Sequence, residues 1–384
     1  MKRKFRIIVG MLLLAIPLCM NAQVKPTKPG QDPKKAKVEK VEKEKPVKPE
    51  KPEKQRGGLE MPKISGFVQG MYQANLSDKG DLIDNTLRMR RVRLSVDGNL
   101  SKTVSYKIQG DFTRSPMLVD AFIKYKPYRE FAIQVGQFKT PFTLESPINP
   151  VNLEIFDYGE AVQHLVGYSD VCGLKSLGRD LGIMATGDLI QLEGKDFSLV
   201  KYSFGVFNGS GVNTTDNNNR KDFVGKLEIH PMLKELTLSG SYYYGWYDND
   251  DIHNGKRNRW AAGAQYDDGS IVVRAEYLDG TTGYASVDSE GKDIEEYWLS
   301  KGYYAVAGYN FLLGKDKSQK LMPVLRYEYF TKDTNLEKGG KTYYTVGINY
   351  WPVKSLNFKL DYSLIQPEVG DNAHRVVGIL SYKF

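Results

Sequence analysis

The chain has few of the features that identify a helical membrane protein, a disulfide-linked protein or a metalloenzyme. Beyond residue 22, no apolar run approaches the roughly 20 residues that a membrane-spanning helix needs. The only cysteines are Cys19 and Cys172, and Cys19 lies in an N-terminal apolar segment. The four histidines are scattered, with no pair at the spacing of metal ligands. We therefore expect no intramolecular disulfide, no metal or other cofactor, and no enzymatic activity.

Aromatic residues and glycine, by contrast, are abundant. The chain contains 25 Tyr, 16 Phe and 4 Trp together with 37 Gly. This usage is typical of strands, tight turns and the aromatic girdles of transmembrane barrels. A closed β-barrel also leaves no unpaired strand edge in a bilayer, and its alternating polar residues conceal the hydrophobic signal. The composition therefore predicts an all-β transmembrane barrel.

The first 58 residues differ from the rest. Basic residues at positions 2, 3, 4 and 6, an apolar run over 7–18 and a small residue, Ala22, predict a signal peptide at 1–22. Residues 23–58 are rich in Lys, Pro and Glu and contain no aromatic residue, which predicts a disordered periplasmic linker. This linker is either a tether to the cell wall or a partner, or a plain solvated spacer.

The excess of positive charge lies in this N-terminal part. The formal net charge is +8, of which residues 1–22 contribute +4 and residues 23–58 contribute +6, so that residues 59–384 carry −2. The basic isoelectric point therefore does not indicate a nucleic-acid partner. Any preference for anions must come from the local placement of charges inside a pore.

The C-terminal segment reads as a final barrel strand. Between Ala373 and Phe384, Val376, Leu380, Tyr382 and Phe384 share one face of an extended strand. An aromatic terminal residue on an apolar stripe resembles the signal by which outer-membrane barrels are delivered to the barrel-assembly machinery. We therefore expect outer-membrane lipid and that machinery as partners.

Sixteen alternating runs follow residue 58, and an even number is expected of a single-chain bacterial barrel. The runs cover 63–75, 86–98, 103–113, 118–127, 130–138, 180–190, 197–208, 221–230, 235–247, 258–267, 270–279, 298–311, 320–330, 341–351, 355–365 and 373–384. A soluble β-sandwich also alternates, but it would not combine sixteen strands with a signal peptide and a terminal Phe. The prediction is a 16-stranded antiparallel barrel over 59–384.

The faces of the strands follow from the period of two. In the run 355–365, Phe358, Leu360 and Tyr362 are expected to face lipid, and Lys359 and Asp361 to face the lumen. Inward-facing bases alternate with acids, which predicts ion pairs between neighbouring positions. The expected pairs are Lys226 with Glu228, Arg274 with Glu276, Arg326 with Glu328, and Lys359 with Asp361.

The longest irregular stretch lies between the fifth and sixth runs, at about 139–178. Loops of this length in a compact protein are usually functional. We expect this third loop to fold inward and narrow the lumen, with a plain extracellular cap as the alternative. Polar segments at 209–219, 248–254 and 280–293 are expected as further extracellular loops, and the acidic cluster at 248–251 could hold calcium.

Several motifs resemble one family. These are Arg90-Arg91-Val92-Arg93-Leu94, then Asp120-Ala121-Phe122, then Val135-Gly136-Gln137-Phe138-Lys139-Thr140-Pro141-Phe142, and Gly178-Arg179-Asp180-Leu181-Gly182. Together they resemble the phosphate-selective porin O and P family of bacterial outer-membrane porins. The resemblance is clearest over about 63–190. It implies a trimeric, sixteen-stranded channel that is constricted by its third loop and uses basic side chains to pass phosphate.

Basic residues at the expected inward positions are the candidates for an anion path. They are Arg91, Arg93, Lys107, Lys124, Lys126, Lys175 and Arg179. The third loop, however, is acidic, with Glu145, Glu154, Asp157, Glu160 and Asp170 against Lys139 and Lys175. These acids are expected to oppose anion selectivity.

The sequence thus predicts an outer-membrane porin, most simply a homotrimer, through which small hydrophilic solutes diffuse, with small anions such as phosphate as the candidate solutes. The alternative function is structural. In that case the barrel would be largely plugged by its third loop and would anchor the basic linker to the cell wall or to a partner complex.

Overall fold

A computed structural model of the chain describes residues 61–248, 255–287 and 293–384. The strands are β1 Lys63–Ser77, β2 Leu82–Asn99, β3 Val104–Asp111, β4 Leu118–Tyr125, β5 Ala132–Lys139, β6 Arg179–Gln191, β7 Ser198–Phe207, β8 Asp222–Ile229, β9 Leu236–Tyr247, β10 Gly255–Asp267, β11 Ile271–Val287, β12 Asp293–Tyr309, β13 Phe311–Leu313, β14 Gln319–Thr331, β15 Lys341–Val353, β16 Leu356–Pro367 and β17 Ala373–Lys383. The expected signal peptide (1–22) and linker (23–58) lie outside the described residues.

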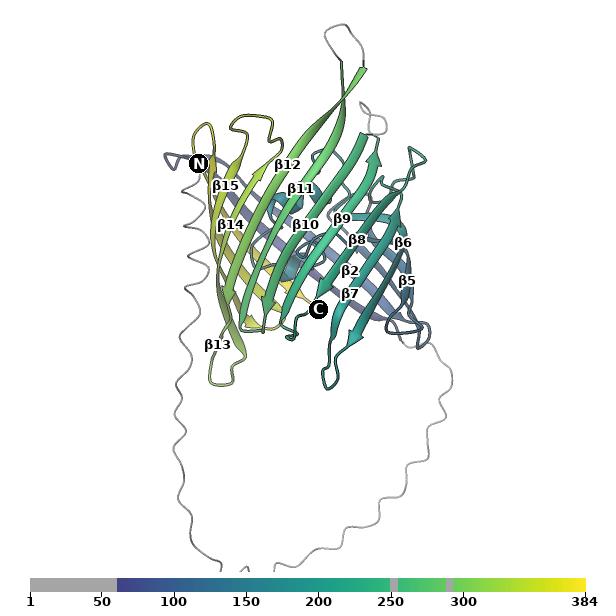
Figure 1. Ribbon diagram of the computed structural model, residues 1–384. Helices are drawn as coiled ribbons and strands as arrows, with labels where there is room; N and C mark the ends of the chain where they lie inside the picture. The colour runs from purple at the N-terminus through teal and green to yellow at the C-terminus, as the bar shows by residue number, and fades with distance from the viewer. Residues whose placement is uncertain (1–60, 249–254, 288–292) are drawn as a thin grey trace, which may run out of the picture. The chain divides into compact units, whose positions relative to one another are not determined.

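The strands form one closed antiparallel sheet (Figure 1). Apart from β12 and β13, each strand pairs with the strands before and after it in the sequence, and β1 closes the sheet by pairing with both β17 and β2. Of the 17 strand segments, β12 and β13 follow each other directly, and both pair with β14. Together they occupy one strand position, so the barrel has sixteen strand positions, as the sequence predicts.

Exposure alternates along the strands as expected for a barrel whose inside is polar and outside apolar. In β16, Phe358 and Leu360 are 44% and 55% exposed, whereas Lys359 and Asp361 are 4% and 1% exposed. The last residue extends the seam, because Phe384 exchanges two backbone hydrogen bonds with Gly66 at 3.0 and 3.1 Å. The expected face assignment in this part of the barrel is confirmed.

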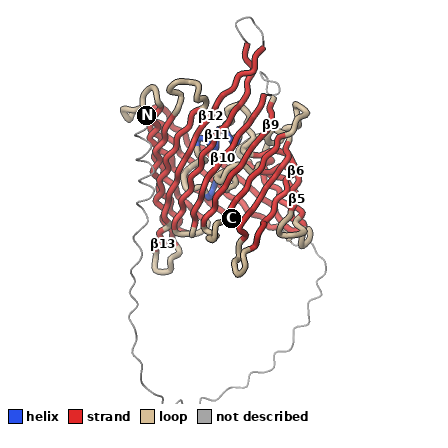
Figure 2. Tube along the Cα trace, viewed as in Figure 1, coloured by secondary structure: helices blue, strands red, loops and turns tan. Residues whose placement is uncertain are grey.

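The connection between β5 and β6, residues 140–178, folds into the barrel, and we call it the inward loop. It contains a 3₁₀ helix, Pro150–Asn152, and the short helix α2, Glu160–Val166, and Figure 2 shows both helices in blue behind the strand wall. Loop residues such as Phe142, Leu153 and Leu165 are fully buried and belong to one apolar cluster with residues of β1, β5, β7–β12, β14 and β17. The expected inward fold of this loop is confirmed, and a plain cap is excluded.

Some strand ends differ from the prediction. The segment 280–293, expected as a loop, is strand at both ends, because β11 extends to Val287 and β12 begins at Asp293. Its Thr and Tyr residues pair across the hairpin, which is the tallest one in Figure 1. The segment 209–219 is a loop, as expected. Residues 249–254, which include most of the expected calcium cluster, lie outside the described residues.

Within the described residues, no helix has the length and apolar character needed to cross a membrane.

Candidate functional site: the inward loop and a basic cavity

The acidic side chains of the inward loop point at arginines on the barrel wall. Asp170 binds Arg259 of β10 through two hydrogen bonds of 2.6 Å each. Glu154 lies 2.6 Å from Arg274 of β11. Glu145 is fully buried at 3.6 Å from the same Arg274 and 3.8 Å from Arg326 of β14. These carboxylates therefore attach the loop to β10–β14 and are turned away from the opposite wall.

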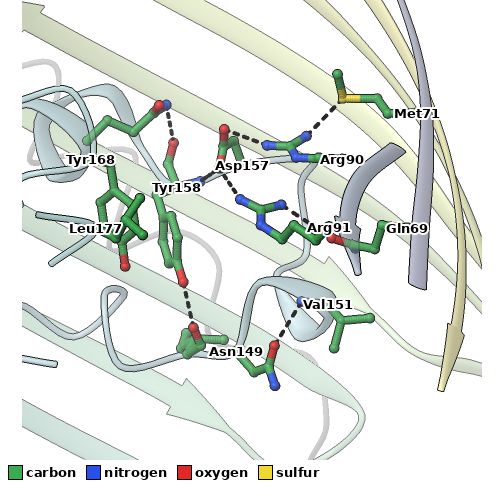
Figure 3. Close-up of polar contacts among 12 residues, drawn as sticks. Gln69, Met71, Arg90, Arg91, Asn149, Val151, Asp157, Tyr158, Tyr168 and Leu177 are labelled. Atoms are coloured by element: carbon green, nitrogen blue, oxygen red, sulfur yellow. Dashed lines mark hydrogen bonds and ion pairs between the residues drawn. The ribbon is translucent and has the colours of Figure 1, made fainter. Parts of the chain in front are cut away.

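Asp157 attaches the loop to the other side, at β2. Its carboxylate lies 2.5 Å from Arg90 and 3.5 Å from Arg91 (Figure 3). Two consecutive residues of a regular strand would point to opposite faces. Here Gln69 pairs with Arg91 and Gly70 pairs with Met89, so Arg90 is the extra residue of a β-bulge. The bulge brings both guanidinium groups into the lumen.

Backbone groups of the loop are also held by wall side chains. Glu276 of β11 accepts hydrogen bonds from the backbone N–H of Leu144 at 2.5 Å and of Glu145 at 3.3 Å. Glu328 of β14 accepts from the N–H of Glu160 at 2.8 Å. Lys359 of β16 donates to the carbonyl oxygen of Leu153. The loop is therefore fixed by a polar wall matched to its own charges, in addition to its apolar cluster.

The ion pairs with arginine change the pKa values of the loop acids. Burial would raise the pKa of Asp170, but the charge and hydrogen bonds of Arg259 outweigh it and lower this pKa to about 2. Burial would also raise the pKa of Glu154, and Arg274 lowers it. For Glu145, burial prevails over Arg274 and Arg326, and its pKa is raised. The Arg–acid clamps at Asp170 and Glu154 thus stay ionised at neutral pH.

A cavity of about 220 Å³ lies between the edge of the inward loop and strands β2–β6. Its walls carry four basic side chains and one carboxylate, with two phenylalanines and the loop prolines. The lining residues are Arg93, Lys107, Gln109, Asp120, Phe122, Gln134, Phe138, Lys139, Pro147, Asn149, Pro150 and Arg179. The inward loop thus leaves a space beside a part of the wall that is rich in positive charge.

The four cations of the cavity differ in how they are bound. Arg93 Nε donates to Asp111 at 2.9 Å. Arg179 donates hydrogen bonds to both carboxylate oxygens of Asp120 at 2.7 and 3.3 Å. Lys139 donates to the Ser146 carbonyl, to the Ile148 carbonyl and to the Tyr158 hydroxyl. Among the described residues, the ammonium group of Lys107 forms no ion pair or hydrogen bond.

Comparison with known proteins identifies this arrangement. The family model of the phosphate-selective porins O and P matches residues 63–376. This chain belongs to that family. It is an outer-membrane porin, a channel through which small hydrophilic solutes diffuse. Family and fold are those of a channel rather than an enzyme.

Solved structures share the fold of this porin at low sequence identity. The anion-selective porin from Comamonas acidovorans is 13% identical with a TM-score of 0.59, over 84% of this chain and 99% of that one. The outer-membrane channel DcaP of Acinetobacter baumannii is 14% identical with a TM-score of 0.59, over 86% and 99%. OmpF of Salmonella typhi is 14% identical with a TM-score of 0.58, over 85% and 98%. No curated protein matches the chain.

The structure brings together only part of the candidate anion path of the porin. Arg93, Lys107 and Arg179 line the cavity, and Arg91 lies beside it, bound to Asp157. The other candidates lie elsewhere.

Lys124 is half-buried on the inner face of β4, opposite Ser105 of β3. It lies near the end of the barrel at which β17 ends. Lys126 does not lie on a strand, because β4 ends at Tyr125; it is half-exposed at the rim, 3.9 Å from Asp188. Lys175 is exposed on the inward loop and does not line the cavity. Lys126 thus lies beyond the strand on which it was expected, whereas Lys175 lies on the third loop as expected but outside the cavity lining.

Two of the four expected wall ion pairs form. Lys226 lies 2.7 Å from Glu228, and Arg326 lies 2.7 Å from Glu328. Arg274 turns instead to Glu145 and Glu154 of the loop. Lys359 binds the loop backbone, and both carboxylate oxygens of Asp361 are buried without a hydrogen-bond partner in the described part of the chain. These two predictions are wrong because the inward loop competes for the wall cations.

Sequence reasoning missed Arg90, Lys139 and the arginines that donate to the loop acids. The signal for Arg90 was present, because apolar outward positions change phase from Leu87 and Met89 to Val92 and Leu94. A phase change in the period of two indicates a bulge. No group of three or more His, Cys, Asp or Glu side chains in the described residues is arranged to hold a metal ion.

Proposed function

We propose that this porin prefers small anions and that the preference arises at the basic cavity. The observation that carries the proposal is the orientation of the loop acids. Asp157, Glu145, Glu154 and Asp170 each bind a wall arginine, so they do not oppose anions in the way that their number suggests.

The positive charge of the cavity is not balanced locally. Its lining holds Arg93, Lys107, Lys139 and Arg179 against Asp120. Counting Asp111, which binds Arg93 from outside the lining, four bases face two acids and leave an excess of +2. Low-dielectric walls focus such a field in a narrow passage and raise the local concentration of anions.

The test is the zero-current potential across planar bilayers in a salt gradient. Lys107→Gln removes the one cavity cation with no partner, and we expect the potential to shift towards cation preference, more strongly in dilute salt where screening is weak. Lys126→Gln, at the half-exposed rim, is the matched control and should change the potential much less. A wild-type channel that prefers cations would overturn the proposal.

The family description makes phosphate the first solute to examine. If phosphate enters the cavity, its addition should reduce the chloride current of single wild-type channels, and Lys107→Gln should weaken that block. Absence of any block would remove phosphate from the candidate solutes and leave the anion preference itself to the zero-current test.

We further propose that the porin assembles as a homotrimer through the sector β2–β5. Strands β3, β4 and β5 have 8 residues each, whereas a tilted strand needs about 9–11 residues to cross a bilayer. Beside them, β2 extends past the end of β3 and exposes Leu87 and Met89, which pair only on the β1 side. Unpaired backbone edges are not tolerated in lipid, so this sector requires a protein cover.

One structural neighbour, OmpT of Vibrio cholerae, is described as a trimer, which supports a second copy of this chain as that cover. Cross-linking tests it. Leu87→Cys should give cross-linked oligomers in native membranes, whereas Leu325→Cys, on the outward face of β14, should not. The natural Cys172 is buried and should give little background. Equal cross-linking from both positions would contradict this interface.

The first and last strands meet at one end of the barrel, where Phe67 pairs with Lys383. With an even number of strand positions, this favours a periplasmic position for the linker at 23–58, with the barrel-assembly machinery reading the last strand from that side. Protease added to intact cells should then leave the linker uncut, and protease added after the outer membrane is opened should remove it.

A further inference from the structure

We propose that the outer face of β11–β15 binds one anionic phospholipid, with an acyl chain in an apolar groove and the phosphodiester group at Lys315 and Lys317. The site lies outside the lumen, so this proposal does not depend on the preference for anions. It rests on three features that lie next to one another: a groove in the lipid-facing surface, a short strand that continues from it, and two exposed lysines at the end of that strand.

The groove is a hollow of about 600 Å³ over strands β11, β12, β14 and β15. Its floor contains Ala307, whose small side chain lies between the larger Val273 on β11 and Leu325 on β14. The lining consists of aliphatic residues, glycine, proline and one tyrosine, and it holds no charged side chain. Such a surface fits a hydrocarbon chain, and hydrocarbon surrounds the outside of a transmembrane barrel.

A proline interrupts the sheet at one end of this groove. Strands β12 and β13 pair with β14 in the same register, which sets Tyr309 opposite Pro323. Because Pro323 has no N–H to donate, the pairing breaks there, and β13 begins two residues later. Tyr309 and Phe311 contact each other with ring centroids 4.5 Å apart, and Leu313 is also exposed. Strand β13 therefore continues the apolar surface from the groove to the end of the barrel.

The turn after β13 carries the charge that an anionic headgroup needs. Residues 314–318 join β13 to β14 at the end of the barrel where β17 ends, and Figure 1 shows this hairpin reaching beyond the strand ends beside it. Lys315 and Lys317 are exposed, and in the described part of the chain no ion pair or hydrogen bond engages either ammonium group. Asp316 lies between them, but it accepts hydrogen bonds from the Ser318 hydroxyl at 2.9 Å and the Ser318 N–H at 3.3 Å. The turn thus has a net charge of +1.

The spacing between the groove and the turn suits a phospholipid. Pro323 lies four residues from Gln319, where β14 begins. With a strand rise of about 3.4 Å per residue and a tilt of about 40°, this separation is roughly 10 Å along the membrane normal. The hydrocarbon layer of one leaflet is roughly 15 Å deep. A turn in the headgroup layer therefore places the groove beside the acyl chains of the same leaflet.

A lipid is favoured over a second copy of the chain as the occupant. Strand β12 lies eight strand positions from β4, half-way round the barrel from the sector β2–β5 through which the homotrimer is proposed. The phosphodiester of a lipid also complements the charge of Lys315 and Lys317. Leu325 lines the groove, so the lack of cross-links expected from Leu325→Cys is what a lipid-covered groove requires.

Native mass spectrometry of the full-length porin with added lipid tests the headgroup site. We expect the wild type to bind one dioleoyl phosphatidylglycerol per protomer about fivefold more tightly than dioleoyl phosphatidylethanolamine, the factor that one net charge near a headgroup layer supports. Lys315→Gln/Lys317→Gln should remove this preference. Lys195→Gln/Lys234→Gln is the control, because it removes two exposed lysines from the β6–β7 and β8–β9 turns at the same end of the barrel, and it should retain the preference.

The groove is tested by filling it. Ala307→Trp should weaken the binding of both lipids fourfold or more, since each methylene group that leaves the groove costs about that factor. Ala262→Trp is the control, on the outward face of β10 and outside the groove. Ala307→Leu is a smaller change that should also weaken binding, and it keeps the test valid if Ala307→Trp fails to insert. The conductance of Ala307→Leu should equal that of the wild type, because the groove lies outside the lumen.

Three results would overturn the proposal. The first is equal affinity of the wild type for the two lipids, or a preference that survives in Lys315→Gln/Lys317→Gln. The second is lipid binding by the Ala307 variants that equals that of Ala262→Trp. The third is cross-linked oligomers from Leu325→Cys, which would show that protein covers the groove. None of these results bears on the zero-current potential, so the anion preference is decided separately.

Discussion

Replacing Arg274 with Gln should release part of the inward loop. Arg274 is 1% exposed and lies 2.6 Å from Glu154 and 3.6 Å from Glu145. Removing one partner of a buried ion pair leaves an uncompensated charge and costs about 3–5 kcal/mol. That free energy corresponds to roughly two to four powers of ten in the equilibrium between the docked and released loop. Glu145 keeps Arg326 at 3.8 Å, so we expect the lower end of this range.

Single-channel recording in planar bilayers measures the effect. A released loop moves across the lumen, so the open-channel current of Arg274→Gln should become noisier and show brief closures. The zero-current potential should also shift towards cation preference, because Glu154 is no longer held against the wall. Lys221→Gln is the control, since it removes a partly exposed ion pair with Asp216, and such pairs contribute about 0–1 kcal/mol.

The double variant Arg274→Gln/Glu154→Gln gives the decisive comparison. It removes the charge that the single variant leaves uncompensated, so current noise and zero-current potential should both return towards the wild type. If Arg274→Gln channels insert normally and show the same current noise and zero-current potential as the wild type, then the ion pair between Arg274 and Glu154 does not hold the loop.

Further predictions address the bulge, the acids and the two chain ends. Arg90→Leu should increase current noise because Arg90 binds Asp157; if Arg90 faced lipid, Leu would leave the recording unchanged. The pKa of Asp170 is lowered from 3.8 to about 2, so its contribution to loop docking is complete above about pH 4 and is lost as pH falls through about 2, and an Asp170→Asn variant should lack the part of the rise in noise that falls in that window. Deleting Phe384, which pairs with Gly66, should reduce heat-modifiable barrel in the outer membrane but not secretion, and normal barrel levels would argue against a terminal assembly signal. A chain lacking residues 25–56 should insert and conduct like the full chain, unless the linker has a role in folding.

The fold follows from the sequence wherever strands are regular. Along β16 the period of two places every side chain correctly, because Phe358, Leu360 and Tyr362 alternate without a phase change. Along β2 the same rule fails at Arg90, since a bulge adds one residue to one strand only. Strand ends are harder to predict. The polar composition of 280–293 suggests a loop, yet β11 and β12 remain paired from Gly283 with Tyr297 to Val287 with Asp293, beyond the last pairing of β11 with β10 at Thr282.

The site is less predictable than the fold because its ion pairs join distant parts of the chain. Arg274 and Glu276 lie two positions apart on one face, so sequence reasoning pairs them with each other. In the structure Arg274 binds Glu154, which is 120 residues earlier in the chain. No local pattern shows whether Glu276 or Glu154 pairs with Arg274, because the pairing depends on where the inward loop lies in three dimensions.

The position of the loop acids, more than their number, sets the electrostatics of the pore. Asp170, Glu154 and Glu145 neutralise Arg259, Arg274 and Arg326 on one half of the wall, and the apolar cluster of the loop fills the space between them. The three arginines on that half of the wall are therefore each paired with a loop acid. The opposite half keeps an excess of bases around the remaining space, and interactions in such a narrow passage are screened less than at an open surface. An acidic loop is therefore compatible with the proposed anion preference, because its acids pair with arginines on one part of the wall and leave the excess of bases around the cavity uncompensated.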